Sequence, residues 1–144
     1  MNARVVTICI GLLAACGSDA IEVTPADYRA DLQSICIDTT ATLDALPRPP
    51  ELISVADFAT SAAGALDNEA ERARSLDVPD DLADDHRSFV RNTDEQVTAW
   101  RSIATVGDDT ARLDELTVRI GELIRGRNDL VDEMGATDCR RGDV

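Results

Sequence analysis

His86 is the only histidine of the chain, and it lies in a segment whose apolar residues recur at helical spacing. A histidine in such a position usually packs in the core with one ring nitrogen hydrogen-bonded, and the sequence favours this interpretation. The alternative is a cofactor- or metal-binding bundle that uses His86, for example with Met134 as a second haem ligand. Aromatic residues make up only 3% of the chain, too few to line a haem pocket. We therefore expect no cofactor.

The remaining residue types give little support to enzyme chemistry. A di-iron carboxylate site in a helical bundle needs two Glu-x-x-His motifs, which a single histidine cannot supply. No serine is flanked by glycines as in a nucleophile elbow, and no glycine-rich phosphate loop is present. All 14 basic residues are arginine, which excludes lysine-based Schiff-base chemistry. We expect a protein that is not an enzyme.

An acidic cluster could attract a divalent cation; it consists of Asp77, Asp80, Asp81, Asp84 and Asp85. The cluster lacks the alternating ligands and the turn glycine of a calcium loop. Acidic residues also stabilise the positive N-terminal end of a helix, which explains the cluster without a ligand. We predict no metal site here, while weak cation association by Asp80, Asp81, Asp84 and Asp85 stays open.

Cys16 stands in a setting that suits covalent lipidation. The charged start Met1-Asn2-Ala3-Arg4 is followed by a nine-residue apolar run, Val5 to Leu13, which is too short to span a bilayer. The run ends in Leu13-Ala14-Ala15-Cys16, which resembles the bacterial lipobox. This resemblance implies that residues 1–15 are a cleaved signal peptide and that Cys16 becomes the lipid-bearing first residue. Residues 16–24 would then form a short tether that anchors the domain to the cell membrane.

Two cysteines would remain in the mature domain, Cys36 and Cys139, once Cys9 is removed and Cys16 is lipidated. Disulfides persist in the oxidising extracytoplasmic compartment, so we predict a Cys36–Cys139 disulfide. Two free thiols or a metal site are the alternatives. Two cysteines and one distant histidine fall short of the three or four protein ligands that zinc normally takes.

The chain is strongly acidic. Without residues 1–15 it would carry 13 basic and 28 acidic residues, a formal charge of −15. Such a chain repels nucleic acid and anionic lipid headgroups, so we expect no nucleic-acid partner. An envelope protein or a small ligand is the expected kind of partner, besides the membrane reached through Cys16.

Start and stop signals mark four helices of roughly 20 to 26 residues. The starts are Thr24-Pro25, Ser54, Val78-Pro79, and Asp108 as the cap after Gly107; the stops are Pro47, Pro79, Gly107 and Gly135. Val23 with Tyr28, and Ile53 with Phe58, have the spacing of a hydrophobic staple. The second apolar stripe runs Val55, Phe58, Ala62, Leu66, Ala73, Leu76, and the fourth runs Leu113, Leu116, Ile120, Leu123, Leu130, Met134.

Short connections between helices of similar length favour antiparallel neighbours. We therefore predict an all-α fold, an up-down-up-down four-helix bundle over residues 25–139 closed by one disulfide, with residues 140–144 as a C-terminal tail. On the helix surfaces, Glu115–Arg119 and Arg91–Glu95 have the spacing of i,i+4 ion pairs.

The chain also resembles a group of small, functionally uncharacterised actinobacterial lipoproteins. The resemblance rests on the lipobox, on Ser34-Ile35-Cys36-Ile37, on Leu46-Pro47, and on Met134-Gly135-Ala136-Thr137-Asp138-Cys139. It implies a disulfide-closed helical bundle and no particular activity. The sequence thus predicts an extracytoplasmic lipoprotein that serves as a binding or interaction module at the cell envelope.

The lipid-anchor hypothesis makes a direct prediction. Because the chain has one short apolar run and no second hydrophobic segment, Cys16→Ser should leave the protein either uncleaved or released into the medium. Membrane fractionation with detergent phase partitioning measures this. A cleaved mutant that still partitions as a membrane protein would contradict the lipid anchor.

Overall fold

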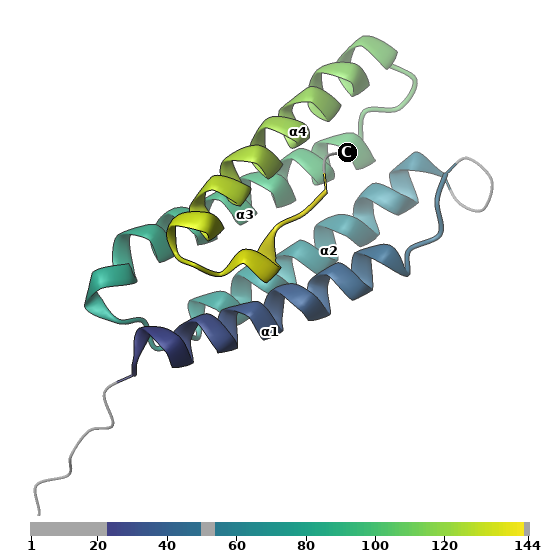
Figure 1. The fold of residues 1–144 in the computed structure, drawn as a ribbon. Coiled ribbons are helices and arrows are strands. Elements are labelled where there is room, and N and C mark those ends of the chain that lie inside the picture. Colours follow the sequence, from purple (N-terminus) through teal and green to yellow (C-terminus); the bar gives the residue numbers. More distant parts are fainter. Residues whose placement is uncertain (1–22, 50–53, 143–144) are drawn as a thin grey trace, which may run out of the picture.

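The computed structural model describes residues 23–49 and 54–142. This part of the chain is helical and contains no strand. The four long helices are α1 (Pro25–Asp44), α2 (Val55–Arg74), α3 (Ala83–Ala104) and α4 (Thr110–Glu133), and two short 3-10 turns are η1 (Asp80–Leu82) and η2 (Thr137–Cys139). The helices run alternately up and down, which confirms the predicted all-α four-helix bundle (Figure 1).

Local capping explains where three of the helices begin. Thr24 Oγ1 accepts a hydrogen bond from Asp27 N at 3.2 Å, and Ser54 Oγ accepts one from Asp57 N at 3.1 Å, as the sequence predicts. The N-cap of α4 is Asp109, whose carboxylate accepts a hydrogen bond from Arg112 N at 3.0 Å. The prediction of Asp108 was therefore wrong by one residue, because the turn after Gly107 is one residue longer than expected.

Other local predictions are confirmed in part. Gly107 and Gly135 follow α3 and α4 with φ values of 64° and 70°, a left-handed conformation that glycine adopts without strain. Asp80 lies in η1 rather than in α3, so the third helix begins later than its acidic start signal indicates. Val23 packs against the core cluster that contains Tyr28, as the staple predicts, whereas Ile53 lies outside the described residues.

The surface ion pairs differ from the predicted ones. Arg119 contacts Glu95 of α3 at 2.7 Å and Glu122 at 3.6 Å, and Glu115 pairs with Arg112 at 2.6 Å. Arg119 thus joins α4 to α3 and also pairs within α4 at i,i+3 spacing, in place of the predicted i,i+4 pair with Glu115. Long arginine side chains reach across a helix interface as easily as along a helix, which sequence spacing alone does not capture.

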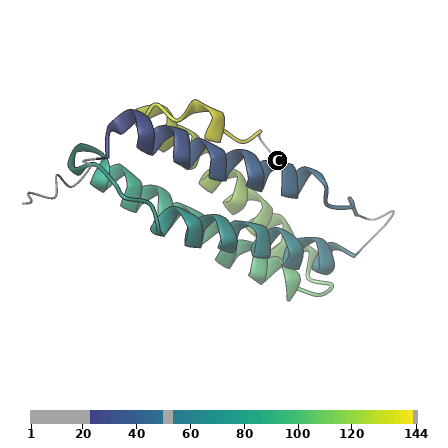
Figure 2. The same cartoon turned by 90° about the horizontal axis from the view of Figure 1, so that it is seen from below.

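The bundle is closed on its fourth side by the C-terminal segment, defined here as residues 134–142. Consecutive helices pack against each other, but α1 contacts α2 and η2 much more than it contacts α4. Figures 1 and 2 show the C-terminal segment returning from the end of α4 and lying between α4 and α1. The disulfide Cys36–Cys139 fixes η2 to the middle of α1 and confirms the predicted pairing.

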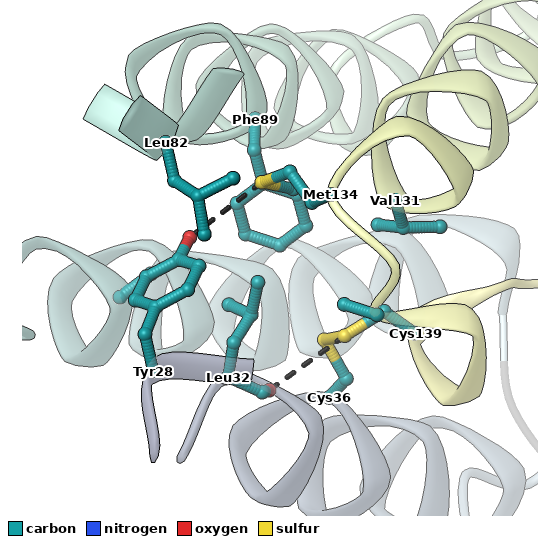
Figure 3. Packing of buried hydrophobic residues seen from close by; sticks show 10 residues of the cluster. Tyr28, Leu32, Cys36, Leu82, Phe89, Val131, Met134 and Cys139 are labelled. Carbon is teal, nitrogen blue, oxygen red and sulfur yellow. Dashed lines mark hydrogen bonds between the residues drawn. A yellow bond between two sulfur atoms is a disulfide. The ribbon is translucent and has the colours of Figure 1, made fainter. Parts of the chain in front are cut away.

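The apolar core is divided into two clusters along the bundle. We call the end where α1 begins proximal and the opposite end distal. The proximal cluster joins α1, α2, α3, α4 and η2 around Tyr28, Leu32, Phe89 and Met134 (Figure 3). The distal cluster contains only residues of α2, α3 and α4 and their connections, among them Ile103, Ile120 and Ile124. The distal half of α1 therefore takes no part in the distal core.

None of the helices in the described part of the chain combines the length and the apolar character that crossing a bilayer requires.

The disulfide should contribute substantially to stability. It links residues 103 positions apart. Closing a loop of about 100 residues lowers the entropy of the unfolded chain, which stabilises the folded state by up to roughly 4–5 kcal/mol, often less in practice. We predict that Cys36→Ala with Cys139→Ala lowers the free energy of unfolding by several kcal/mol in urea titrations. Reduced wild-type protein should lose a similar amount. A loss below about 1 kcal/mol would show that η2 is held by packing alone.

Candidate functional site: a buried arginine network and a distal cleft

A polar network occupies the centre of the bundle, between the two apolar clusters. Its core is the ion pair between Arg127 of α4 and Glu69 of α2, both fully buried. Arg127 Nη1 and Nη2 donate to the two carboxylate oxygens of Glu69 at 3.1 and 2.9 Å, a bidentate geometry that matches the planar guanidinium to the carboxylate. This pair joins α2 to α4 across the bundle.

The other Arg127 donors are also satisfied. Nε donates to the carbonyl of Cys139 at 3.3 Å, Nη1 to Thr93 Oγ1 at 3.3 Å, and Nη2 to Cys36 Sγ at 3.4 Å. The guanidinium lies 4.5 Å from the centroid of the Phe89 ring, a cation–π contact. All five N–H groups of Arg127 therefore have acceptors, which is the condition for burying such a group at a tolerable cost.

A second arginine reaches the same carboxylate from the C-terminal segment. Arg141 Nη2 donates to Glu69 at 2.8 Å and Arg141 Nη1 to Gln96 at 3.2 Å. The backbone of Arg141 is held by Asn128 through two hydrogen bonds of 2.9 Å. Burial lowers the pKa of Arg127 to about 10; nearby Arg141 adds to this effect, and Glu69 opposes it.

The network holds two guanidinium groups and one carboxylate, so it carries an excess of one positive charge. The Arg141 side chain is only 8% exposed, and its Nε has no hydrogen-bond partner in the described part of the chain. An unmatched buried cation and an unsatisfied N–H are both costly, and both would be relieved by an anion.

The network was not predicted from the sequence, although the sequence contains a signal for it. The stripe of α4 runs Ile120, Leu123, Arg127, Val131, Met134, and Arg127 falls at the spacing of a core position. Glu69 likewise falls between Leu66 and Ala73 on the buried face of α2. A charged residue at a core position of each of two helices, with opposite signs, is the pattern that predicts a buried ion pair.

Next to the network, a cleft opens in the distal half of the bundle. It has a volume of about 360 Å³, near the lower end of the range of about 300–1,000 Å³ for small-molecule pockets. It exists because the distal half of α1 is separated from the distal core. The described residues that line it are Thr40, Leu43, Asp44, Arg48, Phe58, Ala62, Leu66, Gln96, Trp100, Ile124, Arg140, Arg141 and Gly142.

The cleft has an apolar part and a basic part. Phe58 and Trp100 meet edge to face with ring centroids 5.6 Å apart, and Arg48 lies 5.8 Å from the Phe58 centroid. Arg141 lines the cleft and belongs to the network. We call this the distal cleft.

His86 lies beside the proximal cluster, against Tyr28, and does not line the distal cleft. It is buried, and its Nδ1 is 2.9 Å from the Tyr28 hydroxyl oxygen, which confirms that one ring nitrogen is hydrogen-bonded in the core. The same hydroxyl lies 3.6 Å from Met134 Sδ (Figure 3). The Tyr28 hydroxyl thus contacts both side chains that the sequence offered as haem ligands, His86 and Met134.

The acidic cluster surrounds the proximal start of α3. Asp77, Asp80 and Asp81 line an open surface hollow together with Val23 and Pro25, and Asp84 pairs with Arg87. Across the described ranges, no three His, Cys, Asp or Glu side chains come together closely enough to hold a metal ion. The predicted signal peptide 1–15, Cys16 and the predicted tether up to residue 22 lie outside the described residues, as do residues 143–144 of the predicted tail.

The buried network makes a prediction about the order of three variants. Glu69→Gln leaves two buried cations without a counter-charge and should cost about 3–5 kcal/mol, enough to leave little folded protein. Arg127→Met leaves Glu69 paired with Arg141 and should cost less. Arg141→Gln, which keeps the neutral Arg127–Glu69 pair, should cost least, about 1–3 kcal/mol. Urea denaturation of the three variants measures the order, and Arg141→Gln as the most damaging change would contradict it.

His86 should make stability depend on mild acid. Burial, with a smaller effect of Arg87, lowers the pKa of His86 below its usual 6.5. The unfolded chain then binds a proton that the folded chain resists, so stability should fall as the pH drops below about 6.5. Melting temperatures between pH 7.5 and 5.5 should show this slope in the wild type and a weaker slope in His86→Gln. Equal slopes in both proteins would assign the acid sensitivity to the carboxylates.

Comparison with known proteins identifies no relative of this chain. No protein-family model matches the chain, and no curated protein or solved structure matches it. The resemblance to actinobacterial lipoproteins therefore stays a prediction from the sequence.

Proposed function

We propose that the mature protein is a lipid-anchored, non-enzymatic binding protein of the cell envelope, and that the distal cleft is its ligand site. The anchor is supported by the lipobox-like Leu13-Ala14-Ala15-Cys16. The binding role is supported by the separation of distal α1 from the distal core, which leaves aromatic side chains facing an open space. This separation is the observation that carries the proposal, because a bundle with a purely structural role would gain stability by closing it.

The residue types in the cleft favour binding over catalysis. Its described polar lining consists of arginines, Thr40, Asp44 and Gln96. Asp44 lies 3.9 Å from Arg48, and the side chain of Gln96 bonds Asn92 and Arg141. Among these described groups, none forms a nucleophile and base within hydrogen-bond reach of each other, which hydrolytic chemistry would need. The described lining of the cleft therefore offers groups that can bind and orient a ligand.

The test uses Trp100, the only tryptophan of the chain, as an internal reporter. Full-length protein carrying Cys16→Ser, which lacks a covalent lipid, is titrated with the neutral apolar probe N-phenylnaphthylamine. Saturable energy transfer from Trp100 to the probe is the expected result, since the indole lines the cleft.

A matched pair of variants localises the signal. Thr40 lines the cleft, whereas Thr42 lies on the same helix and is exposed. Thr40→Phe should fill the cleft and abolish saturable binding, and Thr42→Phe should leave it unchanged. Binding that is absent in the parent protein, or equal in both variants, would contradict a ligand site in the distal cleft.

A further inference from the structure

The charge around the distal cleft differs from that of the rest of the protein. The whole chain has 28 acidic and 14 basic residues. The described lining of the cleft has three arginines, Arg48, Arg140 and Arg141, and one acidic residue, Asp44. Arg48 and Arg140 also pair with Asp44 and Asp132, while the network behind Arg141 adds its excess positive charge. In a strongly acidic protein, this is a local site for an anion.

We propose that the distal cleft takes a single-chain amphiphile with an anionic oxygen headgroup, either a carboxylate or a phosphate, with the headgroup at Arg141 and the chain among the apolar residues. This proposal rests on the proposed function, because it names the ligand class of the same cleft. The two parts of such a ligand match the two parts of the lining.

The headgroup position follows from Arg141. Its side chain is more than nine-tenths buried, lines the cleft, and has an Nε without a partner in the described residues. A guanidinium binds carboxylate and phosphate oxygens through paired N–H groups. An anion here would compensate the excess charge that Arg127 and Arg141 leave over Glu69. Low solvent access strengthens this attraction relative to one at the surface.

The chain position follows from the opposite lining. Leu43, Phe58 and Trp100 are only half-buried, whereas Leu66 and Ile124 at the same cleft are buried. Covering the three half-buried side chains would remove apolar surface from water. A volume of about 360 Å³ suits one short chain and leaves no room for a two-chain lipid.

Other ligand classes fit less well. A cation would meet three arginines, and a neutral amphiphile would leave the Arg141 charge uncompensated. The proximal hollow near Asp77, Asp80 and Asp81 would repel an anion and offers no aromatic wall. The distal cleft is therefore where an anionic amphiphile is matched both in charge and in apolar contact.

The experiment compares headgroups on one chain length. The full-length Cys16→Ser protein is titrated with decanoate, decyl phosphate, decanol and decyltrimethylammonium, each below its micelle concentration, with Trp100 fluorescence as the readout. We expect one or both anions to bind at least tenfold more tightly than decanol, and the cation to bind most weakly. The decanoate and decyl phosphate titrations also show which of the two headgroups the site prefers. From octanoate to decanoate, affinity should rise about threefold to fourfold per methylene until the cleft is full.

Charge variants locate the headgroup. Arg141→Gln should remove most of the preference for the anion over decanol, while Arg87→Gln, a change at an exposed proximal arginine, should leave it unchanged. Circular dichroism and the melting temperature check that Arg141→Gln is folded. Arg48→Gln, at an exposed rim position, gives a second measurement that does not disturb the network and should weaken anion binding two- to fivefold.

The outcomes separate the two proposals. Equal affinity for decanoate, decyl phosphate and decanol, or an anion preference that folded Arg141→Gln retains in full, would overturn the anionic ligand while the cleft remained a binding site. If neither the amphiphiles nor the neutral probe bind, the proposed function itself is wrong. If Arg141→Gln does not fold, the headgroup series in the parent protein still tests the proposal, because equal binding of all headgroups would contradict it. Arg48→Gln then serves as the charge variant.

Discussion

The burial of Arg127 places a demanding constraint on the whole bundle. A guanidinium has five N–H donors in fixed directions, and in a dry core each of them needs an acceptor. The acceptors come from Glu69 in α2, Thr93 in α3, and Cys36 with the carbonyl of Cys139 at the disulfide. Elements far apart in the sequence must therefore be in place together. A leucine at this position would pack against any apolar neighbours, whereas Arg127 accepts only this arrangement.

The same constraint accounts for the position of the C-terminal segment. Its residues supply the Cys139 carbonyl to Arg127 and the Arg141 guanidinium to Glu69, and the disulfide fastens it to α1. Because the segment lies between α1 and α4, these two helices cannot close on each other. The described part of the segment also reaches the distal cleft, where Arg140, Arg141 and Gly142 form part of the lining. The cleft thus lies beside the network because one segment serves both.

Sequence patterns predicted the elements of this fold better than its central site. Helical spacing, caps such as Thr24 and Ser54, and the pair Cys36–Cys139 each depend on local chemistry or on counting. The Arg127–Glu69 pair joins two of many charged residues, 58 positions apart in the sequence. An apolar stripe shows which face of a helix is buried, but it does not show which residues of other helices contact that face.

The distal cleft was harder still to predict. Its presence depends on how the distal half of α1 lies relative to α2, α3 and the C-terminal segment, a property of the assembled bundle. No pattern within one helix carries that information. In the sequence, Trp100 and Phe58 are ordinary members of apolar stripes. In the bundle they are half-buried and line the cleft, which makes them candidate ligand contacts and not core residues.

The proximal end of the bundle carries an acidic surface, and this bears on how a lipid-anchored form would be oriented. The acidic cluster around Asp80 lies at the proximal end, close to the first described residue, Val23. Of the cleft arginines, Arg48 follows the distal end of α1, whereas Arg141 lies in the central network. With the lipid on Cys16, a tether of about eight residues would hold the proximal end within about 27 Å of the membrane. Anionic headgroups would repel that end over a Debye length of about 8 Å. The bundle would then stand away from the surface as far as the tether permits, with its distal end toward the surrounding solution.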